Sequence, residues 1–311
     1  MDTSTDNPLV LKAAWCYYME GCTQQEISEM LGISRAKVIR LLDEARERGV
    51  IRFVFRQEDA GRMRIERQLI DRFGLRDAFV VPAPDNPSNL RESIARAAAM
   101  YVSGRLRDGG YLNVGYGDTM GLMLKHLLNA RADHKLNVVS LTGGVSYYLP
   151  EISSEASFGM YLYLIPTPLV VSTPAMRDQL MEEPSVKSIY HMTGLADMSI
   201  TSVGGIGDDA TVLRNSILSK ADLVTLRMQG AVGDILTHFI DANGDPVDTE
   251  LDSRTISTGL DELARMKNVV GVAAGADKAQ VIRAALRRHY FDVLITDMNT
   301  AMGVLADSNE H

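Results

Sequence analysis

Apolar residues follow a helical spacing in the first part of this chain and gather into short runs in the rest. The spacing predicts helices at residues 8–20 and 58–73, with a strand-like alternation at 50–55 between them. Further along, strands are predicted at 78–81, 111–115, 137–141, 169–172, 198–203, 223–228, 269–273 and 293–296. Helices are predicted at 90–106, 119–128, 176–182, 186–193, 210–220 and 278–288. This alternation predicts an α/β fold with a doubly wound, mostly parallel sheet that helices cover on both faces.

The two early helices each offer apolar side chains to a core. Those of the first are Leu9, Leu11, Ala14, Trp15 and Tyr18. Trp15 could stack on a base, but in the middle of a helix we expect it to pack beneath the helices that follow. Those of the second are Ile65, Leu69, Ile70 and Phe73. A charged helix with one apolar stripe fits a linker that either dimerises or packs on the next domain. The expected domains are therefore residues 1–56, a linker helix at 57–76, and residues 77–311.

Residues 23–42, TQQEISEMLGISRAKVIRLL, have the spacing of two short helices joined by a tight turn. Gly32 is the turn residue, because a residue without a Cβ lets the chain reverse tightly. Thr23 with Glu26 makes a capping box for the first helix, and Ser34 is placed as N-cap of the second. The apolar residues on the inner faces are Ile27, Leu31, Ile33, Val38 and Leu41.

The second of these helices presents basic residues in its first turns, with no acid before Asp43. Arginine and lysine in that position reach guanine edges and phosphates in the DNA major groove. The alternative is an ordinary helical hairpin with a solvated charged face. With residues 50–55 as a wing, the stretch resembles a winged helix-turn-helix. The candidate DNA-binding residues are Thr23, Gln24, Ser34, Arg35, Ala36, Lys37 and Arg40.

Charge and composition limit what this helical head can do alone. The chain has 311 residues, enough for two domains, and a net charge of −8. Residues 1–56 hold eight basic and eight acidic residues, so the remainder carries the whole negative charge. Affinity for DNA must then come from local placement and from two or more copies of the head.

The cysteines and the apolar runs favour a protein of the reducing cytoplasm. The only cysteines, Cys16 and Cys22, match neither a disulfide framework nor a zinc pattern, and two small buried side chains are the simpler interpretation. The first ten residues lack the basic start and apolar core of a signal peptide. The most apolar run, residues 162–171, is broken by Pro166 and Pro168, so no membrane span is expected.

Glycine-rich loops follow several predicted strands, where α/β sheets gather ligands. They comprise residues 115–119 (GYGDT), 142–144 (TGG), 204–208 (GGIGD) and 275–278 (GADK). Each loop alone is as consistent with a turn as with a site. The first lacks the third glycine of a dinucleotide fingerprint and the lysine of a P-loop, so neither NAD nor ATP is indicated.

Three charged residues add to these loops. Lys278 opposes the dipole at a helix start, which suggests an anion between them, although a solvated lysine is the alternative. Asp234, in a loop expected after the strand at 223–228, is placed to accept bonds from sugar hydroxyls, and Arg214 borders the same region. The candidate effector-binding residues are Gly115, Gly117, Asp118, Thr119, Thr142, Gly143, Gly144, Arg214, Asp234 and Lys278.

The sequence shows few of the motifs that are typical of enzymes. The six histidines show no metal spacing and no nucleophile elbow is present, so we expect no catalytic residue, no metal and no cofactor. The carboxylates Asp208, Asp209 and Asp297 are interpreted as solvated or capping groups.

The chain resembles the SorC-type (sorbitol-operon regulator) family of sugar-binding bacterial transcription regulators along nearly its whole length. The resemblance lies in the helix-turn-helix and in YGDT at 116–119, LTGG at 141–144, GAVGDI at 230–235, the segment 253–286 and LITD at 294–297. It implies an effector domain similar to sugar-phosphate isomerases but without catalysis. It also implies that Gly117, Asp118, Thr119, Thr142, Gly143 and Lys278 form the phosphate end of the site, with Asp234 as a hydroxyl contact.

The resemblance further implies a homodimer or homotetramer that binds double-stranded operator DNA and is controlled by a phosphorylated sugar or polyol. One residue departs from this expectation: the Asp118 carboxylate would repel a phosphate, so either the effector is less charged or Asp118 points away. The mechanism we expect is closure of the α/β domain by effector, which shifts the oligomer interface and the spacing of paired recognition helices. The alternatives are a phosphosugar isomerase with an accessory DNA-binding head, and an architectural DNA-binding protein without ligand.

Overall fold

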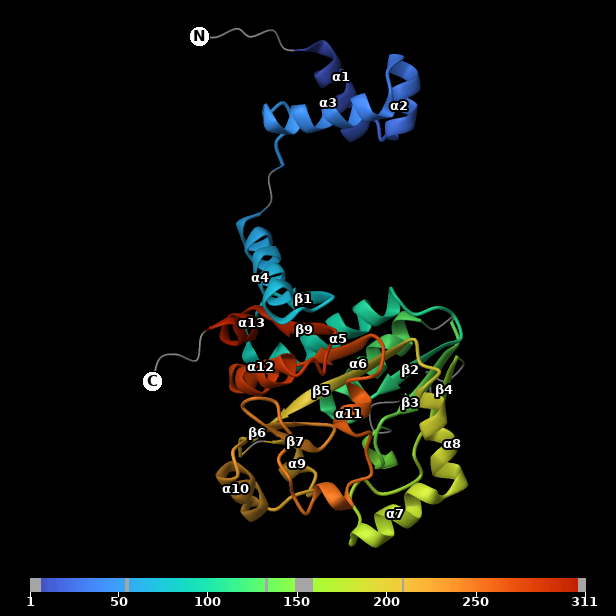
Figure 1. Cartoon of the computed structure of the whole chain (residues 1–311), viewed down its shortest axis with the longest axis vertical. Helices are drawn as coiled ribbons and strands as arrows, with labels where there is room; N and C mark the ends of the chain where they lie inside the picture. Colours follow the sequence, from blue (N-terminus) through green and yellow to red (C-terminus); the bar gives the residue numbers. More distant parts are fainter. Residues whose placement is uncertain (1–6, 54–55, 132–133, 149–158, 209, 307–311) are drawn as a thin grey trace. The chain divides into compact units, whose positions relative to one another are not determined.

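The computed structural model describes residues 7–53, 56–131, 134–148, 159–208 and 210–306. The chain divides into two compact units, Met1–Ala60 and Gly61–His311. Figure 1 shows the first unit as helices and the second as a sheet with helices around it. Along the described parts of the chain, every helix is too short or too polar for a membrane span.

The first unit contains α1 (Pro8–Tyr18), α2 (Gln24–Leu31) and α3 (Arg35–Glu47). Its core is formed by small and branched side chains that are almost fully buried: Val10, Ala13, Ala14, Cys16, Ile27, Val38, Leu41, Leu42 and Ala45. Asn7 caps α1 by accepting a hydrogen bond from the amide of Leu9. Three helices with interlocking apolar faces therefore form a core of their own.

Two expectations for this unit are wrong. Trp15 does not pack beneath the helix pair: it is 53% exposed, and its indole nitrogen donates to Glu20, while Leu11 is also exposed. Of the other expected core residues, Ala14 is buried, and Leu9 and Tyr18 are partly buried against the core. Val10, Ala13 and Cys16 complete the buried face of α1. Residues 50–53 form no strand, and the rest of the expected strand, 54–55, lies outside the described residues.

The second unit is built on a mixed sheet in which the strand order is β1-β9-β8-β5-β2-β3-β4, with every neighbouring pair in that path parallel. Their bounds are β1 Asp77–Val81, β2 Gly110–Val114, β3 Leu136–Ser140, β4 Met160–Tyr163, β5 Met198–Gly205, β8 Val269–Val272 and β9 Val293–Asp297. A hairpin of β6 (Ala231–Ile235) and β7 (His238–Asp241) pairs antiparallel with the end of β5. The expected doubly wound, mostly parallel sheet is confirmed.

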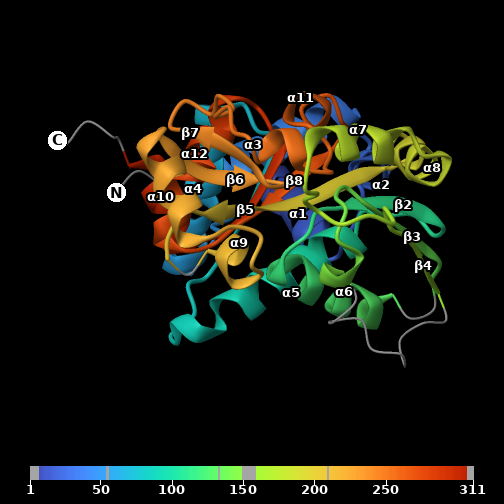
Figure 2. The ribbon, with the colours of Figure 1, turned by 90° about the horizontal axis from the view of Figure 1, so that it is seen from below.

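Helices cover both faces of this sheet, so its strands are apolar on both sides. On one face lie α5 (Leu90–Ser103) and α6 (Asp118–Ala130), which pack on side chains such as Leu112, Val114 and Ile200. On the other lie α4 (Gln57–Phe73), α12 (Ala279–Arg287) and α13 (Met298–Leu305), packed on Val80, Val269 and Leu294. Figure 2 shows α5 and α6 on the opposite side of the sheet from α12.

Several predicted elements differ from the structure. Residues 223–228 form a helix, α10 (Lys220–Met228), because Ser219 and Asp222 make a capping box that starts it. The predicted helix at 210–220 is reduced to α9 (Thr211–Arg214). Residues 169–172 make only an isolated bridge through Val170, since the preceding Pro166 and Pro168 donate no ladder hydrogen bonds, and the unpredicted β4 pairs with β3 instead. The remaining helices are α7 (Pro174–Glu182), α8 (Pro184–Thr193) and α11 (Leu260–Leu263).

The apolar stripe of α4 packs on the sheet domain. Leu69 and Phe73 are buried in the same cluster as α12 and α13, and Ile65 and Ile70 pack against it. Glu66 of this helix accepts a hydrogen bond from the backbone amide of Val80 in β1 at 2.8 Å. Of the two interpretations open from the sequence, packing on the next domain is the one that the structure shows.

Leu69→Ala is expected to destabilise the second unit by about 2–5 kcal/mol, because it leaves a cavity in a close-packed core. Met63→Ala on the same helix is the matched control, since Met63 is 52% exposed. Urea unfolding followed by far-UV circular dichroism measures the effect. The single tryptophan, Trp15, lies in the first unit, so its fluorescence should report an unchanged head. Equal losses for both variants would contradict the burial of Leu69.

Candidate nucleic-acid interface and ligand cleft

The helix pair α2–α3 is shaped by local hydrogen bonds. The Thr23 hydroxyl accepts from the amide of Glu26 at 3.2 Å, and the Glu26 carboxylate accepts from the amide of Thr23 at 2.7 Å. These bonds lower the pKa of Glu26. Gly32 ends α2 with φ 63°, in the left-handed region that favours glycine. Ser28 donates to the carbonyl of Ile33 across the turn at 2.5 Å. The expected helix-turn-helix geometry is therefore set by short-range contacts.

The start of α3 gathers the candidate DNA contacts on one open surface. Ser34 accepts from the amide of Lys37, and the Arg35 guanidinium donates to the side chain of Gln24 at 3.3 Å. The side chains of Arg35, Ala36, Lys37 and Arg40 are exposed. Two of the acids of α3 pair with basic groups near its far end, Asp43 with Arg46 and Glu44 with Arg48. The exposed beginning of α3 is therefore positive and polar.

A cleft of about 550 Å³ opens in the second unit, at the carboxyl ends of β2, β5 and β8. Its walls come from the start of α5, the start of α6, α9 and the segment that leads into α12. A smaller cavity of about 40 Å³ adjoins it, and both are lined by Arg91, Thr119, Thr211 and Lys278. From β2 the chain proceeds to β3 on one side, and from β5 to β8 on the other. The cleft therefore lies at the switch point where such sheets bind ligands.

Glycines allow the backbone to close around this cleft. A Cβ on Gly115 would lie 2.2 Å from Thr201 Oγ1, and one on Gly204 would lie 1.9 Å from Asp234 Oδ1. Gly117 has φ 124° and precedes α6, so its loop turns directly into the helix. The glycines of the two loops thus serve close packing beside the cavity.

Asp234 is the buried carboxylate of the cleft, with 3% of the residue exposed. It lies within β6, which follows α10, whereas the sequence placed it in a loop after a strand. Its Oδ2 accepts from the amide of Thr237 at 3.0 Å, in a turn where Leu236 and Thr237 both have positive φ. Burial raises the pKa of Asp234 to about 6, although the Thr237 amide, Lys278 and His238 act in the opposite direction. The group is a hydrogen-bond acceptor held facing the small cavity.

The remaining candidates divide into two sets. Gly117, Asp118, Thr119, Arg214, Asp234 and Lys278 line one or both cavities. Thr142, Gly143 and Gly144 do not line them: Thr142 is buried and bonds to the Tyr148 hydroxyl, and a Cβ on Gly143 would lie 2.5 Å from the carbonyl oxygen of Pro168. Gly115 packs behind the cavity, against Thr201 and Leu236.

The sequence analysis missed Arg91, Ser202, Thr211 and Asp277 of the lining. Arg91 belongs to the first turn of α5 and approaches Asp118 Oδ2 to 3.2 Å through its guanidinium. Arg214 of α9 reaches the same oxygen at 2.6 Å. A search for basic residues at helix starts would have found Arg91, but its meeting with Arg214 depends on the fold.

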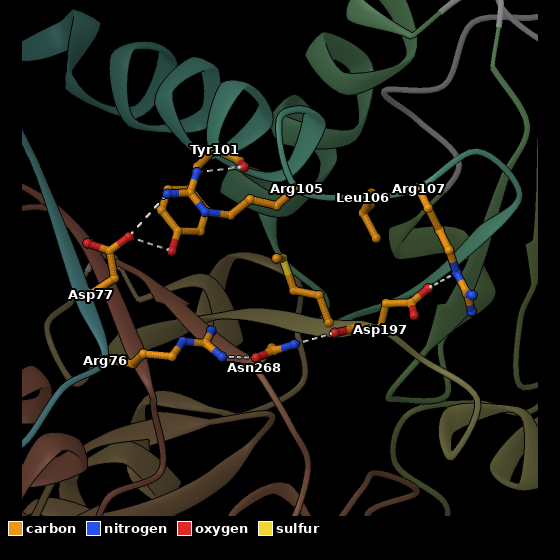
Figure 3. A pocket seen from close by; sticks show the side chains of 9 residues that line it. Arg76, Asp77, Tyr101, Arg105, Leu106, Arg107, Asp197 and Asn268 are labelled. Atoms are coloured by element: carbon orange, nitrogen blue, oxygen red, sulfur yellow. Dashed lines mark hydrogen bonds and ion pairs between the residues drawn. The ribbon is translucent and has the colours of Figure 1, made fainter. Parts of the chain in front are cut away.

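A second pocket, of about 480 Å³, lies at the opposite edge of the sheet, where β1 and β5 begin. Figure 3 shows its polar and charged groups joined to one another by hydrogen bonds and ion pairs. The Tyr101 hydroxyl and Arg105 donate to Asp77, Arg107 donates to Asp197, and Arg76 donates to Asn268. These contacts join α5 and the segment after it to the start of β1, and they join segments that lead into β1 and β8 and into β2 and β5. The charged groups of this pocket therefore bind one another.

Comparisons with known proteins match both units of the chain to transcription regulators or their domains. Residues 58–306 match the family model described as "Putative sugar-binding domain", and residues 20–52 match one described as winged helix-turn-helix DNA-binding. The chain is 37% identical over 304 residues to the transcriptional regulator LsrR of Klebsiella pneumoniae subsp. pneumoniae, covering 97% of this chain and 94% of the relative. It is 32% identical over 299 residues to LsrR of Escherichia coli K12 / DH10B, covering 95% and 94%.

Among solved structures, the fold is similar to that of the full-length sorbitol operon regulator SorC from Klebsiella pneumoniae. The TM-score is 0.69 at 24% identity, over 98% of this chain and 100% of that chain. The sor operon regulator from Shigella flexneri is similar with a TM-score of 0.68 at 22% identity, over 79% and 99%.

Asp234→Asn is expected to change how stability depends on pH. The pKa of Asp234 is about 6 in the folded protein and near 4 when unfolded, so the stability from this group is present at low pH and lost as pH rises through about 6. The free energy of unfolding of the variant, relative to that of wild type, should increase by roughly 2–3 kcal/mol between pH 4 and pH 8. Chemical denaturation at both pH values measures this. Asp208→Asn, which removes a carboxylate that is 91% exposed, should show no such difference.

Proposed function

Because this chain belongs to the SorC-type family of sugar-binding transcription regulators, we propose that a phosphorylated sugar or polyol binds its cleft and controls operator binding. The chain is a DNA-binding transcription regulator with a helix-turn-helix and a sugar-binding α/β domain. We assign DNA binding to residues 1–56, a linker to 57–76, and effector binding and oligomerisation to 77–311. The boundary between the compact units, after Ala60, supports a separate head that ends near residue 56, while residues 61–76 belong to the second unit.

The exposed start of α3 supports a role in reading the major groove. Arg35, Lys37 and Arg40 project from its first turns, and Thr23, Gln24 and Ser34 lie beside them at the ends of the helix pair. Arginine and lysine reach guanine edges, while hydroxyl and amide groups near helix starts bind phosphate oxygens. Because the head is neutral by count, we propose that a homodimer or homotetramer places two recognition helices on one operator. A regulator of this kind works in the cytoplasm, where operator DNA is found.

One observation carries the effector assignment: the cleft combines basic groups with a buried carboxylate. Lys278, Arg91 and Arg214 line its open part, and Asp234 faces the adjoining small cavity beside Thr119. Lysine and arginine bind phosphate oxygens, and a carboxylate accepts hydrogen bonds from sugar hydroxyls. A small molecule with an anionic group at one end and hydroxyls at the other matches this arrangement.

Binding must affect DNA through a difference between two states. We propose that effector draws together the elements that line the cleft, which come from α5, α6, α9 and the start of α12. This closure would shift the oligomer interface and the spacing of paired recognition helices. The effector then acts only as far as its affinity for the two states differs.

A phosphosugar isomerase with an accessory DNA-binding head is the alternative. The relatives of known name are transcription regulators, which favours binding without turnover. Conversion of sugar phosphates by residues 57–311 alone would support the enzyme.

Arg35→Ala and Arg40→Ala are each expected to weaken operator binding by about 1–3 kcal/mol, because each removes a contact to a base or a phosphate. Arg46→Ala is the matched control, since Arg46 lies near the other end of α3 and pairs with Asp43. Fluorescence anisotropy at fixed salt, with a duplex selected by the protein from a random library, measures the affinity. An equal loss for Arg46→Ala would indicate that general charge, not the start of α3, governs binding.

The effector itself is tested by a thermal-shift screen of sugar phosphates, free sugars and polyols, followed by operator release. A ligand at a hundred times its dissociation constant stabilises the folded protein by about 2.7 kcal/mol. Lys278→Ala should lower the affinity for a phosphorylated ligand by about tenfold or more, since it removes a charge-assisted contact. Lys267→Ala, at the opposite edge of the sheet, should leave binding unchanged. A ligand that binds without changing operator affinity would reject the proposed control.

A further inference from the structure

We propose that Asp118 is a built-in competitor for the effector: its carboxylate holds Arg91 and Arg214 in the free protein and releases them to the anionic group of the ligand. The inference rests on the proposed function of the cleft as a site for a phosphate ester. It gives a role to the one carboxylate that the sequence alone makes an obstacle to that function. It also makes Arg91 a ligand-binding residue.

The geometry places these three groups at one point of the cleft. Asp118 is the first residue of α6, Arg91 comes from the first turn of α5, and Arg214 ends α9. Both guanidiniums contact the same atom, Asp118 Oδ2, at 2.6 Å for Arg214 and 3.2 Å for Arg91. Three elements far apart in the sequence thus meet through a single carboxylate oxygen at the cavity wall.

The carboxylate occupies the position where an anionic ligand would bind best. Two guanidiniums that converge on one atom attract an anion at that point, and Arg91 and Arg214 both line the cleft. With Asp118 ionised, the three groups together carry a charge of +1, and without it they would carry +2. Asp118 therefore lowers the attraction for any anion that enters.

The contacts of Asp118 are easily exchanged. The side chains of Arg91, Arg214 and Asp118 are 49%, 42% and 38% exposed, and ion pairs in such positions are weak. Each of the two ion pairs joins one guanidinium nitrogen to one carboxylate oxygen of Asp118. A phosphate ester has three terminal oxygens and binds guanidinium through two parallel hydrogen bonds. A ligand that also reaches Lys278 and Asp234 displaces the carboxylate, whereas a weaker anion does not, so Asp118 sets selectivity.

A positioning role for Asp118 makes the opposite prediction. If the carboxylate only held the two arginines in place for the ligand, its removal would leave them disordered and weaken anion binding. If it competes, its removal strengthens anion binding. The sign of the change therefore separates the two roles.

The test is titration of inorganic phosphate into the full-length protein by isothermal calorimetry, at constant ionic strength set with chloride. Asp118→Asn should bind phosphate about three- to tenfold more tightly than wild type, the range expected for loss of an exposed ion-pair network. Asp208→Asn is the matched control: Asp208 lines neither cavity, its carboxylate is 91% exposed, and its loss changes the charge equally. Its effect should stay below about twofold. Circular dichroism checks that each variant is folded.

A double-mutant cycle tests whether the gain acts through the arginines. In the Arg91→Ala/Arg214→Ala background, Asp118→Asn should no longer tighten phosphate binding. A gain that persists there, or an equal gain for Asp208→Asn, would overturn the inference and leave only general electrostatics. Weaker binding by Asp118→Asn would make Asp118 a positioning residue. Absence of phosphate binding in both wild type and Asp118→Asn would also overturn it.

Failure of the inference and failure of the proposed function are distinguishable. Operator binding and its release by sugar phosphates are measured with labelled DNA and do not depend on the direction of the Asp118→Asn effect. If phosphate affinity follows the predicted pattern but no sugar phosphate releases DNA, the proposed control of operator binding is rejected, while the competitor role of Asp118 is supported. If a sugar phosphate releases DNA and Asp118→Asn weakens phosphate binding, only the competitor role of Asp118 is rejected.

Discussion

The parallel sheet is the constraint on which the rest of the effector domain depends. Parallel strands need crossover connections, and the helices that provide them bury both faces of the sheet. Because every strand along β1-β9-β8-β5-β2-β3-β4 runs the same way, the loops after β2, β5 and β8 open at one edge. Order along the chain reverses between β2 and β5, which leaves a gap between crossovers. The cleft is a consequence of this topology.

The β6–β7 hairpin adds to the cleft what parallel strands cannot supply. It pairs antiparallel with the end of β5 and brings Asp234 opposite Gly204, where a side chain larger than hydrogen would collide with the carboxylate. A buried carboxylate costs free energy unless it is hydrogen-bonded or neutralised. The Thr237 amide provides one such bond, and Lys278 favours the charged form. The site thus holds an acceptor whose charge depends on what surrounds it.

Local chemistry predicted the helical head more directly than the sheet domain. The capping box of Thr23 and Glu26, the Ser34 cap and the positive φ of Gly32 act within a few residues, so the structure repeats what the spacing indicated. The expectation of a strand at 223–228 took no account of a similar local bond. The capping box of Ser219 and Asp222 starts a helix at residues 220–228 instead. Trp15 was expected in the core as an apolar residue in the middle of the helix, yet the smaller side chains of α1 face inward.

The sequence by itself determined the fold class, the helix-turn-helix, the basic start of α3 and most of the strand ends that border the cleft, because caps, periodicity and glycines act at short range. Only the tertiary structure decided which loops share a cavity. It separated Thr142 from Lys278, brought Arg91 and Arg214 to the one oxygen of Asp118, and placed Asp234 in a strand. Such meetings depend on strand order and helix crossovers, which join residues as far apart as Asp118 and Arg214, 96 positions along the chain, and leave no periodic signal in the sequence.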